Sequence, residues 1–191
     1  MKQESLTLSC ERELVLQAAQ GDETAILTLY EQHKTAVTTY IYYRLGGDQA
    51  LAEEIAAEVF ARMVAGLPRF VYRERPFLAW LYTIARNCIK DHYRRDGRYP
   101  NQSLPEQHED ETAGPEQQAH LTLESVRLRQ ALAQITEAQR DVIILRFIEG
   151  RSVAETAALL DKKEGAVKTL TRRALAALRR QLEQTPEYEQ T

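Results

Sequence analysis

Apolar residues recur at steps of three and four along most of this chain, the spacing that places side chains on one face of an α-helix. Only eight Gly and six Pro interrupt the 191 residues, and helix-favouring residue types are frequent. The pattern predicts an all-α protein, long enough for one large or two small helical domains. The clearest stripe, which we expect to be buried, consists of Ile26, Leu29, Tyr30, His33, Val37, Tyr40 and Ile41.

Glycine, proline and aspartate divide the N-terminal half into four expected helices. Gly21-Asp22 and Gly46 to Asp48 each suit the end of one helix and the N-cap of the next. The third helix ends at Gly66 and Pro68, and Pro76 opens the fourth. The apolar face expected for the third helix consists of Ala52, Ile55, Ala56, Val59, Phe60, Met63 and Val64.

Helical periodicity disappears between Gly97 and about His120. Prolines, glycines and an acidic run without Lys or Arg predict a flexible linker at 98–120 that joins two small helical domains, 1–97 and 121–184, with a tail at 185–191. The acidic residues are Glu106, Glu109, Asp110, Glu111 and Glu116.

Beyond the linker, two capping boxes open successive helices, one from Thr136 to Gln139 and one from Ser152 to Glu155. The second box starts a short helix, which is followed by Asp161-Lys162-Lys163 and a longer helix to about Leu182. A short helix, a tight turn and a long helix predict a helix-turn-helix.

In the second helix of this motif, apolar and basic positions separate onto two faces. We expect an inner face of Val167, Leu170, Ala174, Leu175 and Leu178, and an outer face of Lys168, Thr169, Arg172 and Arg173 with Lys163 near the helix start. Such residues can read base edges or neutralise phosphates. The alternative from charge spacing alone is a solvated face on an ordinary helical hairpin.

The net charge of −3 conceals two basic patches. One lies on the long helix of the helix-turn-helix. The other lies near the end of the fourth helix and contains Arg86, Lys90, Arg94, Arg95 and Arg98.

Two separate motifs resemble the short, extracytoplasmic-function (ECF) class of the sigma-70 family of RNA polymerase sigma factors. EGRSVAETA at 149–157 and EGAVKT at 164–169 resemble its region 4, and FLAWLYTIARN at 77–87 resembles region 2. EEIAAEVF at 53–60 looks like the helix of region 2 that contacts polymerase. The chain departs from the family pattern at Asp161, where Gly is common, at Ala57, where Gln is typical, and at Glu54, where Asp is typical.

The resemblance implies a sigma factor that binds core RNA polymerase and directs promoter recognition, melting and transcription initiation. Region 4 would read the minus-35 element as duplex, and region 2 would open the minus-ten element. The implied polymerase contacts are Glu53, Glu54, Ala57 and Glu58. The implied DNA contacts are Phe70, Tyr72, Arg73, Asn87, Lys90, Arg94, Arg95, Lys163, Lys168, Thr169, Arg172 and Arg173. The family also implies an inhibitory anti-sigma factor and a stress or envelope signal.

The implied melting step fits the chemistry of these residues. Unstacked bases need aromatic or amide-bearing pockets beside a positive groove. Asn87 can hydrogen-bond a base edge, and the loop from Phe70 to Arg73 can enclose a flipped base. Trp80 has two interpretations, a core position or a stacking platform, and its helical spacing favours the core.

Two rival functions share part of this pattern. One is a dimeric helix-turn-helix regulator that works without polymerase, and the other is a polymerase-docking protein without promoter activity. No motif supports catalysis, a cofactor, a metal site or a small-molecule substrate. Cys10 and Cys88 lack ligand spacing, the start lacks a signal peptide, and no segment resembles a membrane span, so we expect a cytoplasmic protein with reduced thiols.

Overall fold

The computed structural model describes residues 2–72, 75–95 and 115–184, with only the backbone described at 2–9 and 115–122. Every regular element in these residues is helical, as the periodicity predicted. Arg73, the greater part of the predicted linker (98–114) and the tail at 185–191 lie outside the described residues.

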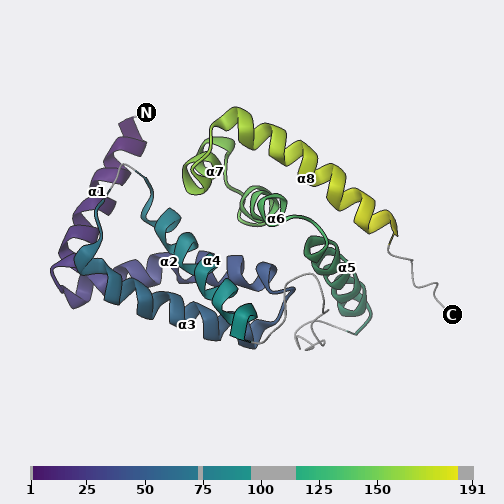
Figure 1. Cartoon of the computed structure of the whole chain (residues 1–191), viewed down its shortest axis with the longest axis horizontal. Coiled ribbons are helices and arrows are strands. Elements are labelled where there is room, and N and C mark those ends of the chain that lie inside the picture. Colours follow the sequence, from purple (N-terminus) through teal and green to yellow (C-terminus); the bar gives the residue numbers. More distant parts are fainter. Residues whose placement is uncertain (1, 73–74, 96–114, 185–191) are drawn as a thin grey trace.

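The N-terminal unit contains four α-helices and one short 3₁₀ turn (Figure 1). These elements are α1 (Lys2–Ala19), α2 (Glu23–Arg44), α3 (Gln49–Gly66), η1 (Leu67–Arg69) and α4 (Phe77–Arg95). The predicted N-caps are confirmed, because Asp22 accepts a hydrogen bond from the Ala25 N–H at 2.8 Å and Asp48 accepts one from the Leu51 N–H at 2.9 Å.

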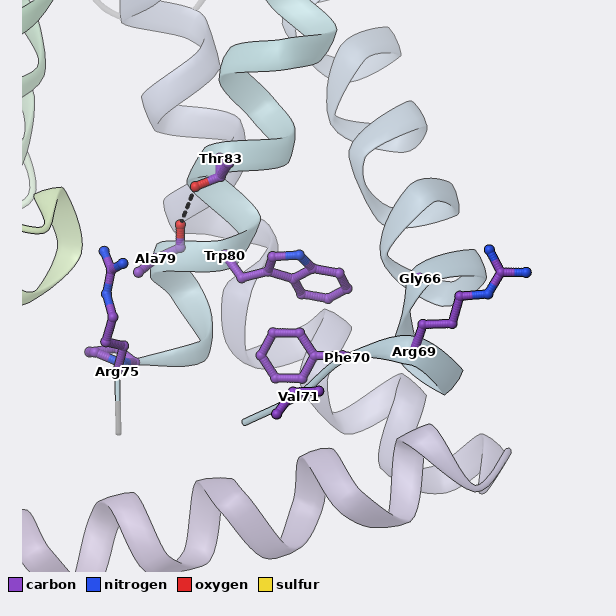
Figure 2. Close-up of a pocket in the computed structure, with 9 residues that line it drawn as sticks. Gly66, Arg69, Phe70, Val71, Arg75, Ala79, Trp80 and Thr83 are labelled. Atoms are coloured by element: carbon purple, nitrogen blue, oxygen red, sulfur yellow. Dashed lines mark hydrogen bonds between the residues drawn. The ribbon is translucent and has the colours of Figure 1, made fainter. Parts of the chain in front are cut away.

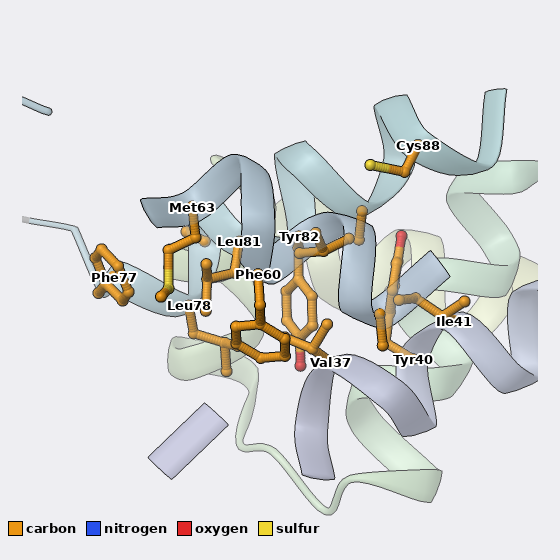
Figure 3. Close-up of a cluster of buried hydrophobic side chains, with 14 of the residues drawn as sticks. Val37, Tyr40, Ile41, Phe60, Met63, Phe77, Leu78, Leu81, Tyr82 and Cys88 are labelled. Carbon is orange, nitrogen blue, oxygen red and sulfur yellow. The ribbon is translucent and has the colours of Figure 1, made fainter. Parts of the chain in front are cut away.

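The core of this unit lies between α2, α3 and α4 (Figure 3). Val37, Tyr40 and Ile41 of α2 pack there against α4, which contributes Leu81 and Tyr82. Each of these large side chains is fully or almost fully buried, which stabilises the fold by about 1.5–3 kcal/mol per residue. Two members of the expected stripes differ: Tyr30 remains 38% exposed and Val64 remains 44% exposed, because both lie at the edge of the buried face.

His33 of α2 is a half-buried histidine whose buried Nε2 atom lacks a hydrogen-bond partner among the described groups. Burial, together with Arg151, lowers the pKa of His33 from 6.5 to about 4. The unfolded chain therefore binds a proton below pH 6.5 that the folded chain rejects until about pH 4, so stability falls as the solution is acidified through this window.

We expect the free energy of unfolding to drop by about 2 kcal/mol between pH 7 and pH 5 because of this one group. Urea unfolding at the two pH values measures the drop. A His33→Phe variant should lose this component, and His92→Gln should retain it. An unchanged drop in His33→Phe would contradict the assignment.

The C-terminal unit consists of α5 (Pro115–Ala133), α6 (Glu137–Ile143), the π-helical turn η2 (Ile144–Ile148), α7 (Val153–Leu160) and α8 (Glu164–Gln184). Both predicted capping boxes are present, at the start of α6 and at the start of α7. Helix α5 begins at Pro115, earlier than the start near Leu121 that periodicity predicted, because a proline suits the first turn and the following residues tolerate helix.

The turn between α7 and α8 depends on Asp161, which adopts a left-handed conformation at φ 57° and ψ 50°. Aspartate is one of the few residues that adopt this conformation at modest cost. The turn of the predicted helix-turn-helix is therefore formed although Gly, which is common here in the resembling family, is absent.

The two units pack against each other. Helix α4 contacts α7, and α2 contacts both α5 and η2. Ile144, Leu145 and Leu159 of the C-terminal unit belong to the buried cluster of the N-terminal unit. The structure is therefore a closed arrangement in which part of the C-terminal unit completes the N-terminal core.

Candidate nucleic-acid and polymerase interfaces

Helix α8 presents a basic outer face. Lys168, Thr169, Arg172 and Arg173 are exposed, as is Lys163, whose carbonyl accepts the Val167 N–H at the helix start. On the opposite side, Val167, Ala174 and Leu178 are buried against the rest of the unit. Leu175 departs from the expected inner face, since it is 42% exposed, one residue beyond the buried position 174.

The cations of this face are available for a ligand. Among the residues that the structure describes, no carboxylate lies within 4 Å of Lys163, Lys168, Arg172 or Arg173. Arg179, further along α8, instead pairs with Glu183 at an Nε to Oε1 distance of 2.7 Å. The first part of α8 is therefore a free cationic surface suited to phosphates and base edges.

A second candidate site is a cavity of about 410 Å³ between the loop after η1 and the first turns of α4 (Figure 2). The rings of Phe70 and Trp80 lie against each other there, with centroids 4.5 Å apart. Arg69 and Arg75 lie on opposite sides of the ring pair in this view. The complete lining is Gly66, Arg69, Phe70, Val71, Arg75, Pro76, Ala79, Trp80 and Thr83.

Gly66 permits this arrangement, because a Cβ atom there would approach the Trp80 ring to 3.0 Å. Trp80 also packs on Phe77 of the core, at a centroid distance of 5.3 Å. It is half-buried, so one part of the ring supports the fold and another part lines the cavity. Trp80 can therefore be both a core residue and a stacking surface for a base.

Tyr72, a predicted base contact, does not line the cavity. Its hydroxyl lies 3.0 Å from the Glu11 carboxylate of α1, which also accepts the Phe77 N–H at 3.1 Å. Burial raises the pKa of Tyr72 to about 12, so the hydroxyl stays protonated and donates. Tyr72 therefore ties the loop and the start of α4 to α1.

The remaining predicted contacts of α4 lie along one side of the helix beyond the cavity. Asn87 is exposed and lies one turn after Thr83, which lines the cavity. Three predicted cations already have acidic neighbours: Lys90 lies 3.9 Å from Glu137, Arg94 lies 3.1 Å from Asp91 and Arg95 lies 3.6 Å from Glu58.

The predicted polymerase-contacting face lies on α3. Glu53, Glu54 and Ala57 are exposed, and Glu53 accepts a hydrogen bond from Gln49 at 2.6 Å. Glu58 is partly covered, since it pairs with Arg62 and Arg95. The face therefore offers two freely exposed positions, Glu54 and Ala57, at its centre.

Sequence reasoning missed Arg69, Arg75 and Thr83 as cavity-lining residues. The two arginines flank the irregular loop, which was a usable signal, but nothing in the helical spacing distinguished Thr83. Within the described ranges, no group of three or more His, Cys, Asp or Glu residues could hold a metal ion, and no helix is long and apolar enough to cross a membrane.

Each of the two units matches a known protein family. Residues 29–99 match the family described as Sigma-70 region 2, and residues 125–178 match Sigma-70, region 4. The chain belongs to the sigma-70 family, in its ECF class of RNA polymerase sigma factors.

Two relatives illustrate this membership. The chain is 35% identical over 192 residues to the ECF RNA polymerase sigma factor SigD of Mycobacterium tuberculosis, covering 96% of this chain and 90% of the relative. It is 39% identical over 173 residues to the ECF RNA polymerase sigma factor BldN of Streptomyces coelicolor, covering 89% of this chain. The chain spans only 65% of the length of BldN.

Solved structures share the fold. CnrH, solved in complex with the cytosolic domain of CnrY, aligns with a TM-score of 0.67 and 27% identity, covering 92% of this chain and 99% of CnrH. The sigma factor RpoE, solved in complex with the anti-sigma factor NepR from Bartonella quintana, aligns with a TM-score of 0.57 and 22% identity. That alignment covers 83% of this chain and 97% of RpoE.

Proposed function

We propose that this protein directs core RNA polymerase to a set of promoters and opens them, and that it is an initiation factor and not an enzyme. One observation carries the proposal: the same chain presents a free basic helix face for duplex DNA and a separate aromatic cavity flanked by arginines. A regulator that only binds duplex needs the first surface and has no use for the second.

Helix α8 supplies duplex recognition. In a helix-turn-helix, the second helix enters the major groove while the first supports it. The exposed Lys168, Arg172 and Arg173 can donate to base edges or neutralise phosphates, and Lys163, exposed at the helix start, can neutralise a further phosphate.

The cavity beside α4 supplies a place for an unstacked base. Its volume of about 410 Å³ lies within the range of small-molecule pockets. Phe70 and Trp80 offer aromatic surface for stacking, and Arg69 and Arg75 can hold the flanking phosphates. Asn87, one turn further along α4, can bond the edge of a neighbouring base.

The partners follow from the surfaces and the family. Core polymerase docks on Glu53, Glu54, Ala57 and Glu58 of α3, in the cytoplasm where transcription occurs. An anti-sigma factor is the expected inhibitor, and the complex of the related CnrH with the cytosolic domain of CnrY supports a protein partner of this kind.

The rival regulator and the rival docking protein make different predictions. A dimeric regulator binds a palindromic duplex tightly without polymerase, and a docking protein keeps its activity when the α8 cations are removed. Neither needs the single-strand cavity.

An Asn87→Ala variant tests the proposed opening step. We expect promoter opening, measured as permanganate reactivity of thymines with core polymerase present, to fall about tenfold, because one base-edge contact contributes about 1–3 kcal/mol. The control is Gln32→Ala, which removes an exposed amide from α2 instead of α4. Promoter opening with this variant should equal that with the wild-type protein. Equal opening by the two variants would contradict this role of Asn87.

A further inference from the structure

A second cavity, of about 490 Å³, lies among the last turn of α2, the last turns of α4 and the start of α6. Its volume lies within the range of small-molecule binding pockets. The charged side chains that line it are the cations Arg44, Lys90, Arg94 and Arg140 and the carboxylates Asp91 and Glu137. Because four cations face only two carboxylates, the cavity is suited to an anion.

Arg44 lines this cavity although its side chain is only 3% exposed. Its Nη1 donates to Asp141 Oδ1 at 3.2 Å, an oxygen that also accepts the Tyr40 hydroxyl at 2.7 Å. Its Nη2 lies 3.4 Å from Glu137 Oε1. The buried Nε atom, by contrast, has no hydrogen-bond partner among the described groups. A buried donor without an acceptor is unfavourable, so Arg44 keeps one donor that an anion in the cavity can satisfy.

Arg140 places a second buried guanidinium beside Arg44. It donates to the carbonyls of Leu132 at 2.7 Å, Ala133 at 2.8 Å and Arg44 at 3.2 Å, which fixes its position in the wall of the cavity. Burial, together with the charge of Arg44, lowers the pKa of Arg140. The two cations therefore repel each other where water screens them poorly, and a bound anion offsets this repulsion.

Lys90 and Arg94 line the cavity from its solvent side, since both side chains are exposed. Lys90 lies 3.9 Å from Glu137, the carboxylate that also pairs with Arg44. Arg94 lies 3.1 Å from Asp91, which also pairs with an arginine of α3. Each carboxylate of the lining is thus shared between two cations, and neither Lys90 nor Arg94 has a carboxylate of its own.

The excess of positive charge indicates the class of ligand. The lining carries two more cations than carboxylates, and the neighbouring pair of Asp141 and Arg86 leaves this difference unchanged. A phosphate monoester carries about two negative charges at pH 7, and its oxygens suit arginine donors. The apolar part of the lining comes from Ile89, Ile135 and Tyr93, and an aromatic ring favours the stacking of a planar group.

We propose that this cavity binds a nucleoside 5′-monophosphate, with the phosphate among the arginines and the base against Tyr93. A mononucleotide fits better than a nucleic-acid strand, because Arg44 and Arg140 are buried beyond the reach of a backbone that runs along the surface. The site is separate from the aromatic cavity beside Trp80 and from the basic face of α8. The inference goes beyond the proposed function and does not rest on it, since the binding needs neither polymerase nor promoter DNA.

Isothermal titration calorimetry of the whole chain with AMP, GMP, CMP and UMP tests this site. We expect at least one of the four to bind at a single site, about tenfold or more tightly than inorganic phosphate or its own nucleoside, because charge-assisted hydrogen bonds and stacking both contribute. The double variant Lys90→Gln/Arg94→Gln should weaken this binding by about tenfold.

The matched control is Lys34→Gln/Arg179→Gln. It also removes one exposed lysine and one exposed arginine, each paired with a glutamate of its own helix and neither lining the cavity. Because distant surface charges are screened by salt, affinity should change by less than about twofold. Tyr93→Leu should weaken binding of the nucleotide and leave binding of inorganic phosphate unchanged. All five replaced positions are at least partly exposed, and circular dichroism checks that each variant remains helical.

Three results would overturn the proposal. One is the absence of saturable binding for all four nucleotides, and another is an equal loss of affinity in the two double variants. The third is binding of a single-stranded oligonucleotide, or of inorganic phosphate, at least as tightly as any mononucleotide. That result would make Lys90 and Arg94 contacts for a phosphate alone. Transcription with core polymerase is measured separately, so the proposed promoter function can hold when this site fails.

Discussion

Replacing Lys168, Arg172 and Arg173 together by Ala should reduce polymerase-dependent binding to the upstream promoter element by at least about a hundredfold. Each base contact contributes about 1–3 kcal/mol and each phosphate contact releases about one counterion, so the loss of three contacts leaves little specific affinity. The three side chains are exposed and lack acidic neighbours in the described part of the chain, so the fold should survive their removal.

Electrophoretic mobility shift of a promoter fragment, with core polymerase and a range of salt concentrations, measures this loss. The salt dependence of binding should become shallower by about one counterion for each phosphate contact removed. Arg179→Ala on the same helix is the matched control, because Arg179 already pairs with Glu183. Equal losses in the two variants would mean that only the overall charge of α8 matters.

Phe70→Ala should weaken binding of the holoenzyme to the opened, single-stranded element by about tenfold or more while leaving duplex binding through α8 unchanged. Stacking of one base on an aromatic ring contributes about 1–3 kcal/mol. Phe70 also packs on Phe77 at a centroid distance of 5.5 Å, so the variant should unfold at a slightly lower temperature.

Fluorescence anisotropy with a fork-junction template, in which only the downstream element is single-stranded, measures this effect. Tyr72→Phe is the control, because it alters the same loop but removes only a hydroxyl that contacts Glu11. The structure predicts a large loss in Phe70→Ala and a small one in Tyr72→Phe. The reverse order would show that the base binds on the α1 side of the loop.

Local features of the fold could be predicted from the sequence because they depend on neighbouring residues. The N-caps at Asp22 and Asp48 and both capping boxes act within three or four positions. The split of α8 into a buried and a basic face also follows from spacing alone. Leu175 was misplaced because an edge position of a helix is buried or exposed according to its neighbours.

Long-range features could not be predicted in this way. Tyr40 and Asp141 are 101 positions apart in the sequence. Helical periodicity shows that each lies in an apolar segment, but it does not show that the two side chains meet. The aromatic cavity likewise depends on the close approach of Trp80 to Gly66, which is a property of how α3 and α4 pack. The charged residues Arg44 and Asp141 within apolar stripes were the available signal for a buried contact.

Run-off transcription with purified core polymerase from the source bacterium, this protein and a library of promoter fragments tests the sigma-factor function most directly. The structure predicts new start sites that share two spaced upstream elements. Their transcripts should fall about tenfold with Asn87→Ala and at least about a hundredfold when Lys168, Arg172 and Arg173 are replaced together by Ala. An absence of new start sites, together with tight binding of the protein alone to a duplex site, would contradict a sigma factor and favour a polymerase-independent regulator.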